Sequence, residues 1–180
     1  MSAAAATTPA YLPAAAYLPH QPPMMWLDEV LSVDERGARC AVTCSPEGVL
    51  GPFYNPQGQL GCSCLIELMA QCVGVWSGYW QKERGEALTE IGLMLGARNL
   101  VFTPDCQLHG QRLIVEATLL MQDGQMGSFE CRVSAAQPAG ELSQLACGRL
   151  NLYSAGSAET AAVLRRAQEA RDGFNCNSLP

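Results

Sequence analysis

The stretch LGCSCLIELMAQCVGVWSGYW, from Leu60 to Trp80, is the most apolar long segment of the chain. Its pattern predicts a helix over about residues 62–81, which ends near Gly85. A helix that is apolar nearly all round must be covered on most of its surface. The fold is therefore decided by what surrounds this helix, and Glu67, a carboxylate inside it, needs its own explanation.

Segments on both sides of the helix have the period of two that is typical of strands. Residues 24–33 predict a strand, or a short helix and a strand, and further strands are expected at 38–44, 91–102, 112–122, 126–134 and 142–153. A curved antiparallel sheet wrapped around one long central apolar helix covers that helix, so we predict the hot-dog fold, of the α+β class. Such a sheet leaves an edge strand open, which favours pairing of two chains.

The chain divides into one domain and two flanking segments. Residues 1–17 are rich in Ala, Pro and Thr and are expected to form a disordered or loosely attached tail. Residues 18–153 are expected to form the hot-dog domain, and residues 154–180 a peripheral C-terminal helix and tail, with Ser157 as a cap. Residues 45–61 are rich in Gly and Pro and predict a long loop, of a kind that often serves function.

Composition excludes several classes of partner. The net charge is −6 and Lys82 is the only lysine, which argues against nucleic acid and anionic membranes as partners.

No signal peptide or membrane span is expected, so we predict a cytoplasmic protein. The nine cysteines form no C-x-x-C pair, so no metal site is expected. The cysteines in apolar runs are expected to be small buried hydrophobes in a reducing compartment: Cys64, Cys72, Cys131 and Cys147.

A polar stripe marks one face of the predicted helix. Ser63, Glu67 and Gln71 are spaced four apart, so they lie on the same narrow face. This face could simply meet water, but an exposed face usually carries several charges, and between Cys62 and Trp80 Glu67 stands alone. A carboxylate held there suits proton transfer, and the free amides of Gly61 and Cys62 could polarise a carbonyl oxygen. Removal of a proton next to a thioester requires such a pair of groups.

Several motifs carry a resemblance to a known family. LPHQPPMMWLDEV followed by IELMAQ resembles the β-hydroxyacyl-acyl-carrier-protein dehydratases, and GLMLGARNLVF is similar to the strand that follows their central helix. GPFYN together with IELMAQCVGVWSGYW looks closer still to the dehydratase-like hot-dog proteins of aryl-polyene and related lipid or polyketide gene clusters. The resemblance extends from Leu18 to Tyr153.

The resemblance implies that Glu67 is catalytic and that its partner is a histidine in an earlier G-H-F-P motif. Counting back without gaps reaches Phe53 instead, and the loop at residues 45–61 contains no histidine. His20, in the L-P-H segment, is the candidate replacement, with packing at the start of the first strand as its alternative; an ordered water is the other candidate. His109 is expected to be a solvated turn residue.

Other residues are weaker candidates. Tyr54 and Asn55 lie in the loop near the missing histidine and could orient a hydroxyl or a water, although both types are common in turns. Arg98 could pair with an acidic carrier protein or a phosphopantetheine phosphate, with a surface salt bridge as the alternative.

The resemblance implies a 3-hydroxyacyl-thioester dehydratase of fatty-acid, polyketide or aryl-polyene biosynthesis. Its substrate would be carried on the phosphopantetheine of an acyl carrier protein or of coenzyme A, and no metal or redox cofactor is expected. Two alternatives remain open: a thioesterase in which Glu67 activates water, and a non-catalytic acyl-binding subunit that pairs with an active dehydratase. The missing loop histidine supports the second of these. The protein is expected to form a homodimer, or a heterodimer with another hot-dog subunit.

Overall fold

The computed structural model describes residues 11–57, 59–61, 63–88, 91–103, 108–138 and 140–155, together with residues 162, 165 and 166. The expected peripheral helix after residue 154, with Ser157 as its cap, falls almost wholly outside these residues. Within the described ranges, no helix is long and apolar enough to cross a membrane.

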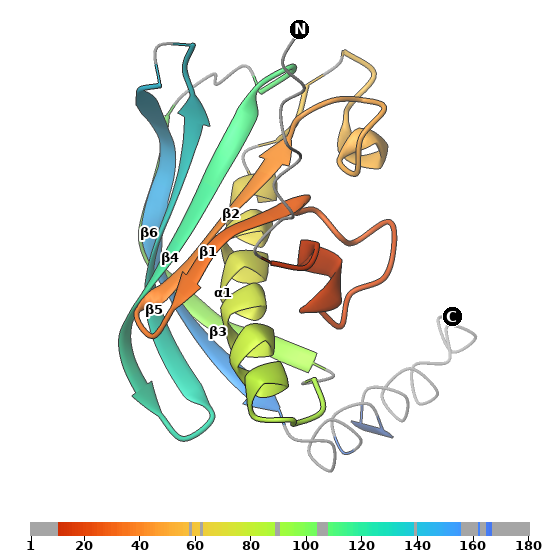
Figure 1. Cartoon of the computed structure of the whole chain (residues 1–180). Helices are drawn as coiled ribbons and strands as arrows, with labels where there is room; N and C mark the ends of the chain where they lie inside the picture. The colour runs from red at the N-terminus through yellow and green to blue at the C-terminus, as the bar shows by residue number, and fades with distance from the viewer. Residues whose placement is uncertain are drawn as a thin grey trace, which may run out of the picture.

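One six-stranded sheet curls around a single long helix, α1 (Ser63–Glu83), as Figure 1 shows. All neighbouring strands are antiparallel, and their order across the sheet is β1 (Glu29–Asp34), β2 (Gly37–Thr43), β4 (Arg112–Asp123), β5 (Met126–Ala136), β6 (Leu142–Ala155) and β3 (Ile91–Phe102). This arrangement confirms the predicted hot-dog fold. Strand β3 has β6 as its neighbour on one side and lies at an edge of the sheet.

The core lies between α1 and the concave face of the sheet. In β4, Leu113, Val115 and Ala117 are buried and point toward the helix, which contributes Leu65 and Met69. Each such side chain stabilises the fold by roughly 1.5–3 kcal/mol through removal of apolar surface from water. The alternation along β4 therefore sets which face of the sheet covers α1.

Cysteines fill part of this core, as expected. Cys64, Cys72 and Cys131 are buried, whereas Cys147 is half-buried. A hydrogen bond with Cys40 and burial raise the pKa of Cys72 well above its ordinary value, and burial raises the pKa of Cys131 to about 12. These two thiols therefore stay protonated at neutral pH and act as small apolar groups.

The predicted bounds of the helix and of β3 agree closely with the structure, whereas the predicted start of the first strand does not. Strand β3 spans the predicted residues, and α1 continues to Glu83, just before Gly85 with its φ of +69°. The first strand begins at Glu29 rather than at Met24. The reason is that the backbone of Met24 and Trp26 forms hydrogen bonds with the side chain of Gln71 in α1 and not with a neighbouring strand.

Residues 11–20, here called the strap, precede the first strand in the chain and lie beside α1 (Figure 1). Within it Ala14 and Tyr17 are buried, and the Tyr11 hydroxyl exchanges hydrogen bonds with the backbone of Val33 in β1. Residues 11–17 of the expected tail are therefore attached to the domain. The two tyrosines supply apolar contacts that the Ala/Pro composition did not reveal, and residues 1–10 lie outside the described residues.

Glycines of α1 let the strap come close. A Cβ at Gly78 would clash with the backbone carbonyl of Tyr17. A Cβ at Gly74 would lie 2.7 Å from the Leu18 side chain, which can turn aside more easily than a backbone group. The strap therefore depends on these two helix positions for its path.

Candidate active site

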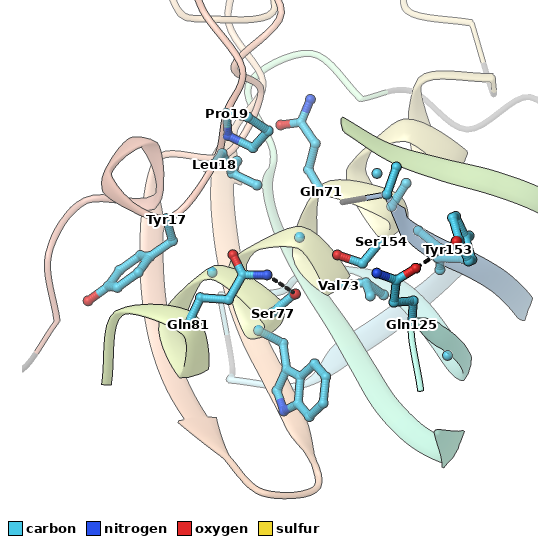
Figure 2. A pocket seen from close by; sticks show the side chains of 18 of the residues that line it. Tyr17, Leu18, Pro19, Gln71, Val73, Ser77, Gln81, Gln125, Tyr153 and Ser154 are labelled. Carbon is cyan, nitrogen blue, oxygen red and sulfur yellow. Dashed lines mark hydrogen bonds between the residues drawn. The ribbon is translucent and has the colours of Figure 1, made fainter. Parts of the chain in front are cut away.

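A cavity of about 480 Å³ follows α1 between the helix, the strap and the sheet (Figure 2). Helix residues from Ile66 to Gln81 line it, which corresponds to a length of about 22 Å at 1.5 Å per residue. The strap contributes one wall, and the β4–β5 hairpin with parts of β3 and β6 contributes the opposite one. We refer to this space as the α1 cavity.

Gln71 holds the carboxylate of Glu67 at the edge of the α1 cavity. Its Oε1 accepts a hydrogen bond from the backbone N–H of Trp26 at 2.9 Å, and its Nε2 donates to the carbonyl of Met24 at 2.7 Å. Because a backbone N–H can only donate and a carbonyl can only accept, these bonds fix the orientation of the amide. Nε2 therefore also faces Glu67 and donates to its Oε1 at 2.8 Å.

The strap brings His20 to the same carboxylate. His20 Nε2 lies 3.9 Å from Glu67 Oε1, and both residues line the α1 cavity. Their side chains are 35% and 32% exposed, so both are reachable from the cavity and neither is in bulk water. His20 Nδ1 is buried and finds no hydrogen-bond partner among the described residues. The geometry thus joins an imidazole and a carboxylate that are far apart in the sequence.

Replacement of Gln71 by Met is expected to cost about 1–3 kcal/mol of stability. Methionine keeps the side-chain length but leaves the Trp26 N–H and the Met24 carbonyl without their partner in a buried place, since Gln71 is 1% exposed. Urea unfolding monitored by circular dichroism measures the change. Gln137→Met, at an exposed turn, is the matched control; an equal midpoint for both variants would contradict the importance of these bonds.

Two further candidates at the start of the helix do not line the α1 cavity. Gly61 and Ser63 are exposed at the start of α1 and are not among the residues that line the cavity, and Cys62 lies outside the described residues. The proposed use of helix-start amides to polarise a carbonyl oxygen therefore has no geometric support from Gly61.

Tyr54 and Asn55 also lie outside the lining of the α1 cavity. Asn55 Oδ1 accepts hydrogen bonds from the backbone N–H groups of Gln57 and Gln59, so the side chain closes its own loop. The Tyr54 ring meets the edge of His109 with centroids 6.1 Å apart, and its hydroxyl has no partner among the described residues. Burial raises the pKa of Tyr54. Neither residue lines the α1 cavity.

Phe53 occupies the position that the missing histidine would have by simple counting. Its ring packs on Trp26, with centroids 4.3 Å apart and planes inclined by 58°. The backbone N–H of Trp26 donates the hydrogen bond that Gln71 Oε1 accepts. An apolar ring therefore takes this place, and the imidazole nearest to Glu67 comes from the strap.

The two remaining candidates are on the surface. His109 is exposed in a turn before β4, as expected. Arg98 is exposed on β3, directly opposite Arg149 of β6, and forms no ion pair with a described residue. The salt bridge weighed as its alternative is therefore not formed within the described part of the chain. The described residues also contain no cluster of three or more His, Cys, Asp or Glu suited to a metal ion.

Sequence reasoning missed the far part of the α1 cavity. Ser77 and Gln81 on the helix, and Gln125 and Tyr153 on the sheet side, line it beyond the Glu67 region. A signal was present, because Glu67, Gln71, Gly74, Gly78 and Gln81 follow each other at spacings of four and three along one helix face. The polar stripe continues through the glycines that admit the strap.

Comparisons with known proteins show the family and the fold of the chain. Residues 12–164 match the ApeP-like family, described as ApeP dehydratase. The chain is 40% identical to a chain of the dehydratase heterocomplex ApeI:P from Xenorhabdus doucetiae, with a TM-score of 0.79 over 86% of this chain and 98% of that chain. A hypothetical thioesterase from Streptococcus pneumoniae TIGR4 is 11% identical, with a TM-score of 0.51 over 72% of this chain and 90% of that one, and shows the fold alone. The resemblance inferred from the helix motif is confirmed, and the protein belongs to the ApeP-like dehydratase family.

Proposed function

We propose that the protein acts in the removal of water from a 3-hydroxyacyl thioester. The observation that carries this proposal is the approach of His20 Nε2 to Glu67 Oε1, at 3.9 Å, on the wall of a cavity long enough for an acyl chain. The chain's family is a family of dehydratases. Elimination needs one group to take the proton at C2 and another to protonate the hydroxyl that leaves C3.

Glu67 and His20 supply one of these two groups each. The proton leaves C2, its electron pair forms the C2–C3 double bond, and the C3 hydroxyl departs with a proton as water. The separation of 3.9 Å is too long for a strong hydrogen bond between the two side chains, so neither is committed to the other. Gln71 donates to Glu67 Oε1 and keeps the carboxylate directed into the cavity. This chemistry requires no metal or redox cofactor.

The carrier of the acyl group belongs to the same proposal. A thioester on phosphopantetheine, attached to an acyl carrier protein or to coenzyme A, presents an acyl chain that the α1 cavity can take up. The cavity is lined by apolar groups along its middle, including Val73, Trp76 and Phe129, which suits a hydrocarbon chain.

A second hot-dog subunit is the proposed protein partner. The outer edge of β3 has no neighbouring strand among the described residues, and Met94, Leu95 and Val101 on it are 49%, 53% and 57% exposed. Exposed apolar residues on an open edge favour pairing with another strand. The relative from Xenorhabdus doucetiae is itself part of a heterocomplex. Another copy of this chain or a related subunit would complete the sheet.

The test is turnover of a 3-hydroxyacyl carrier-protein thioester, with products read by mass spectrometry. His20→Ala is expected to lower the rate of water loss by about 10²-fold or more, because one of the two proton-transfer groups is gone. His109→Ala is the matched control, since His109 is exposed and does not line the cavity, and it is expected to keep the rate. Both variants should retain the melting temperature of the original protein to within a few degrees.

Other outcomes would redirect the proposal. Free acid as the product would mean that the protein is a thioesterase. Absence of turnover by the folded chain, with turnover restored by a second hot-dog subunit, would mean that the chain works only as part of a pair. The loop without a histidine, with Phe53 packed on Trp26, is the specific observation that favours this second reading. A full rate in His20→Ala would exclude His20 as the partner of Glu67.

A further inference from the structure

The outer face of the sheet, which is turned away from α1, carries a group of arginines. In β4, Val115 and Ala117 are buried in the core against the helix, so Glu116 between them belongs to the outer face. The strand register places Arg39 of β2 and Arg132 of β5 directly opposite Glu116. These two arginines therefore lie on the outer face as well.

Two further arginines lie next to each other on the same face. Glu130 is two residues before Arg132 on β5, so it shares the outer face, and Arg149 of β6 is directly opposite Glu130. Arg149 is in turn directly opposite Arg98 of β3. Opposite positions place the Cβ atoms about 4.5–5.5 Å apart. We refer to Arg39, Arg98, Arg132 and Arg149 together as the arginine face.

The positive charge of the arginine face is not balanced within the chain. Arg39 and Arg149 each lie next to a glutamate, with N–O distances of 3.3 and 3.9 Å. Arg98 and Arg132 are exposed and form no ion pair with a described residue. Like charges at opposite positions destabilise a sheet, so the pair of Arg98 and Arg149 costs free energy in the isolated chain. This local excess of positive charge occurs in a chain whose net charge is −6.

Exposed apolar side chains border the arginine face at the end of β4. Leu120 and Met121 are 47% and 58% exposed. Met121 is directly opposite Ser128 of β5, which is two residues before Glu130 and therefore shares the outer face. Neither these residues nor the four arginines line the α1 cavity. The surface thus combines guanidinium groups with apolar contact area, on the side of the sheet away from the reaction centre.

The amount of charge decides which class of partner fits. Recognition of anionic membranes uses clusters of about four to eight basic residues, whereas here only Arg98 and Arg132 lack an acidic neighbour among the described residues. A nucleic acid would be repelled by the acidic remainder of the chain. The guanidinium fork of arginine matches a carboxylate through two parallel hydrogen bonds. An acidic protein surface with some apolar area therefore suits this face best.

We propose that the arginine face docks an acidic amphipathic helix of another protein. Carboxylates of that helix pair with Arg98, Arg132 and Arg149, and its apolar residues cover Met121. The face stays open when a second strand pairs with β3, because strand pairing uses the edge of a sheet and leaves its faces free. The docked protein also leaves the α1 cavity open. It is therefore a partner that binds during turnover, beyond the proposed function, and not the bearer of the substrate.

The probe is a synthetic helical peptide with a ridge of leucines flanked by glutamates, titrated against the full chain by fluorescence anisotropy. The peptide is expected to bind, and its Kd to rise about tenfold or more between about 50 and about 500 mM salt, because salt screens exposed charges. A peptide with lysine in place of every glutamate is expected not to bind. Equal binding of the two peptides, or no binding at low salt, would overturn the proposal.

Substitutions assign the binding to its residues. Arg98→Gln and Arg149→Gln are each expected to raise the Kd of the acidic peptide about threefold, and the double variant about tenfold. Lys82→Gln is the matched control, since it removes the same charge from an exposed position near the end of α1 and is expected to keep the Kd. All three positions are exposed, so the melting temperature should be kept. An unchanged Kd in the double variant would contradict the assignment.

Two further measurements separate this inference from other readings. Co-sedimentation with phosphatidylglycerol vesicles is expected to be absent, and arginine-dependent binding to them would replace the protein partner by a membrane. Turnover of a 3-hydroxyacyl thioester of N-acetylcysteamine, which carries no phosphate, is expected to be unchanged in the double variant. A loss of turnover there would move the arginines to the substrate site and overturn the docking surface. Peptide binding needs no turnover, so this inference and the proposed function can fail separately.

Discussion

Glu67→Gln is expected to lower the rate of water loss by about 10²–10⁴-fold, because an amide of nearly the same shape cannot exchange a proton with the substrate. The hydrogen bond from Gln71 Nε2 can still reach an amide oxygen at this position, so the fold should be kept. The rate is measured on a 3-hydroxyacyl thioester, with the enoyl product followed by mass spectrometry.

A second carboxylate on the same helix provides the control. Glu83 ends α1, is exposed and does not line the cavity, so Glu83→Gln is expected to retain the original rate. If Glu67→Gln retained more than about a tenth of the rate while folded, proton transfer by Glu67 would be ruled out. Equal losses in both variants would point to a general effect of charge on the helix.

Gly78→Ala is expected to destabilise the protein by about 2 kcal/mol or more and to lower activity as well. Alanine is the better helix former by roughly 1 kcal/mol, so a simple propensity argument predicts the opposite. The new Cβ, however, would clash with the carbonyl of Tyr17, and the strap backbone must move away. Since the strap also carries His20, the displacement would pull the imidazole away from Glu67.

Gly74→Ala is the matched control for this prediction. It lies one turn earlier on the same face of α1, and its Cβ would meet only the end of the Leu18 side chain, at 2.7 Å. We expect a change within about 1 kcal/mol, because a leucine rotamer adjusts more readily than a backbone. Urea unfolding of both variants gives the comparison. If Gly74→Ala were the more damaging of the two, the close approach at Gly78 would not be what fixes the strap.

The sequence predicted the fold well because its decisive signals are local. The apolar run from Leu60 to Trp80 and the period of two after Ile91 each reflect burial of one element against another. Glu67 stood out for the same reason, as a lone charge within an apolar helix. The residue spacing was sufficient for these predictions, since it specifies faces of helices and strands directly.

The rest of the site depends on contacts between distant segments, which spacing does not specify. The nearness of His20 to Glu67 follows from the path of the strap, and that path follows from the absence of a side chain at Gly78. Asn55 takes the turn role that was its stated alternative. An Asn side chain in a turn bonds readily to the nearby backbone, and that local use was satisfied first, at Gln57 and Gln59.

A cut in the chain next to the strap would remove part of the proposed site without unfolding the domain. A single proteolytic cut between His20 and the first strand would leave all six strands and α1 covalently continuous, and most of the core with them. The released peptide would carry away the imidazole and one wall of the cavity. Such a nicked molecule would keep its far-ultraviolet spectrum, yet lack the imidazole that we propose for proton transfer. We therefore expect the presence of an intact strap to report an active sample better than folding does.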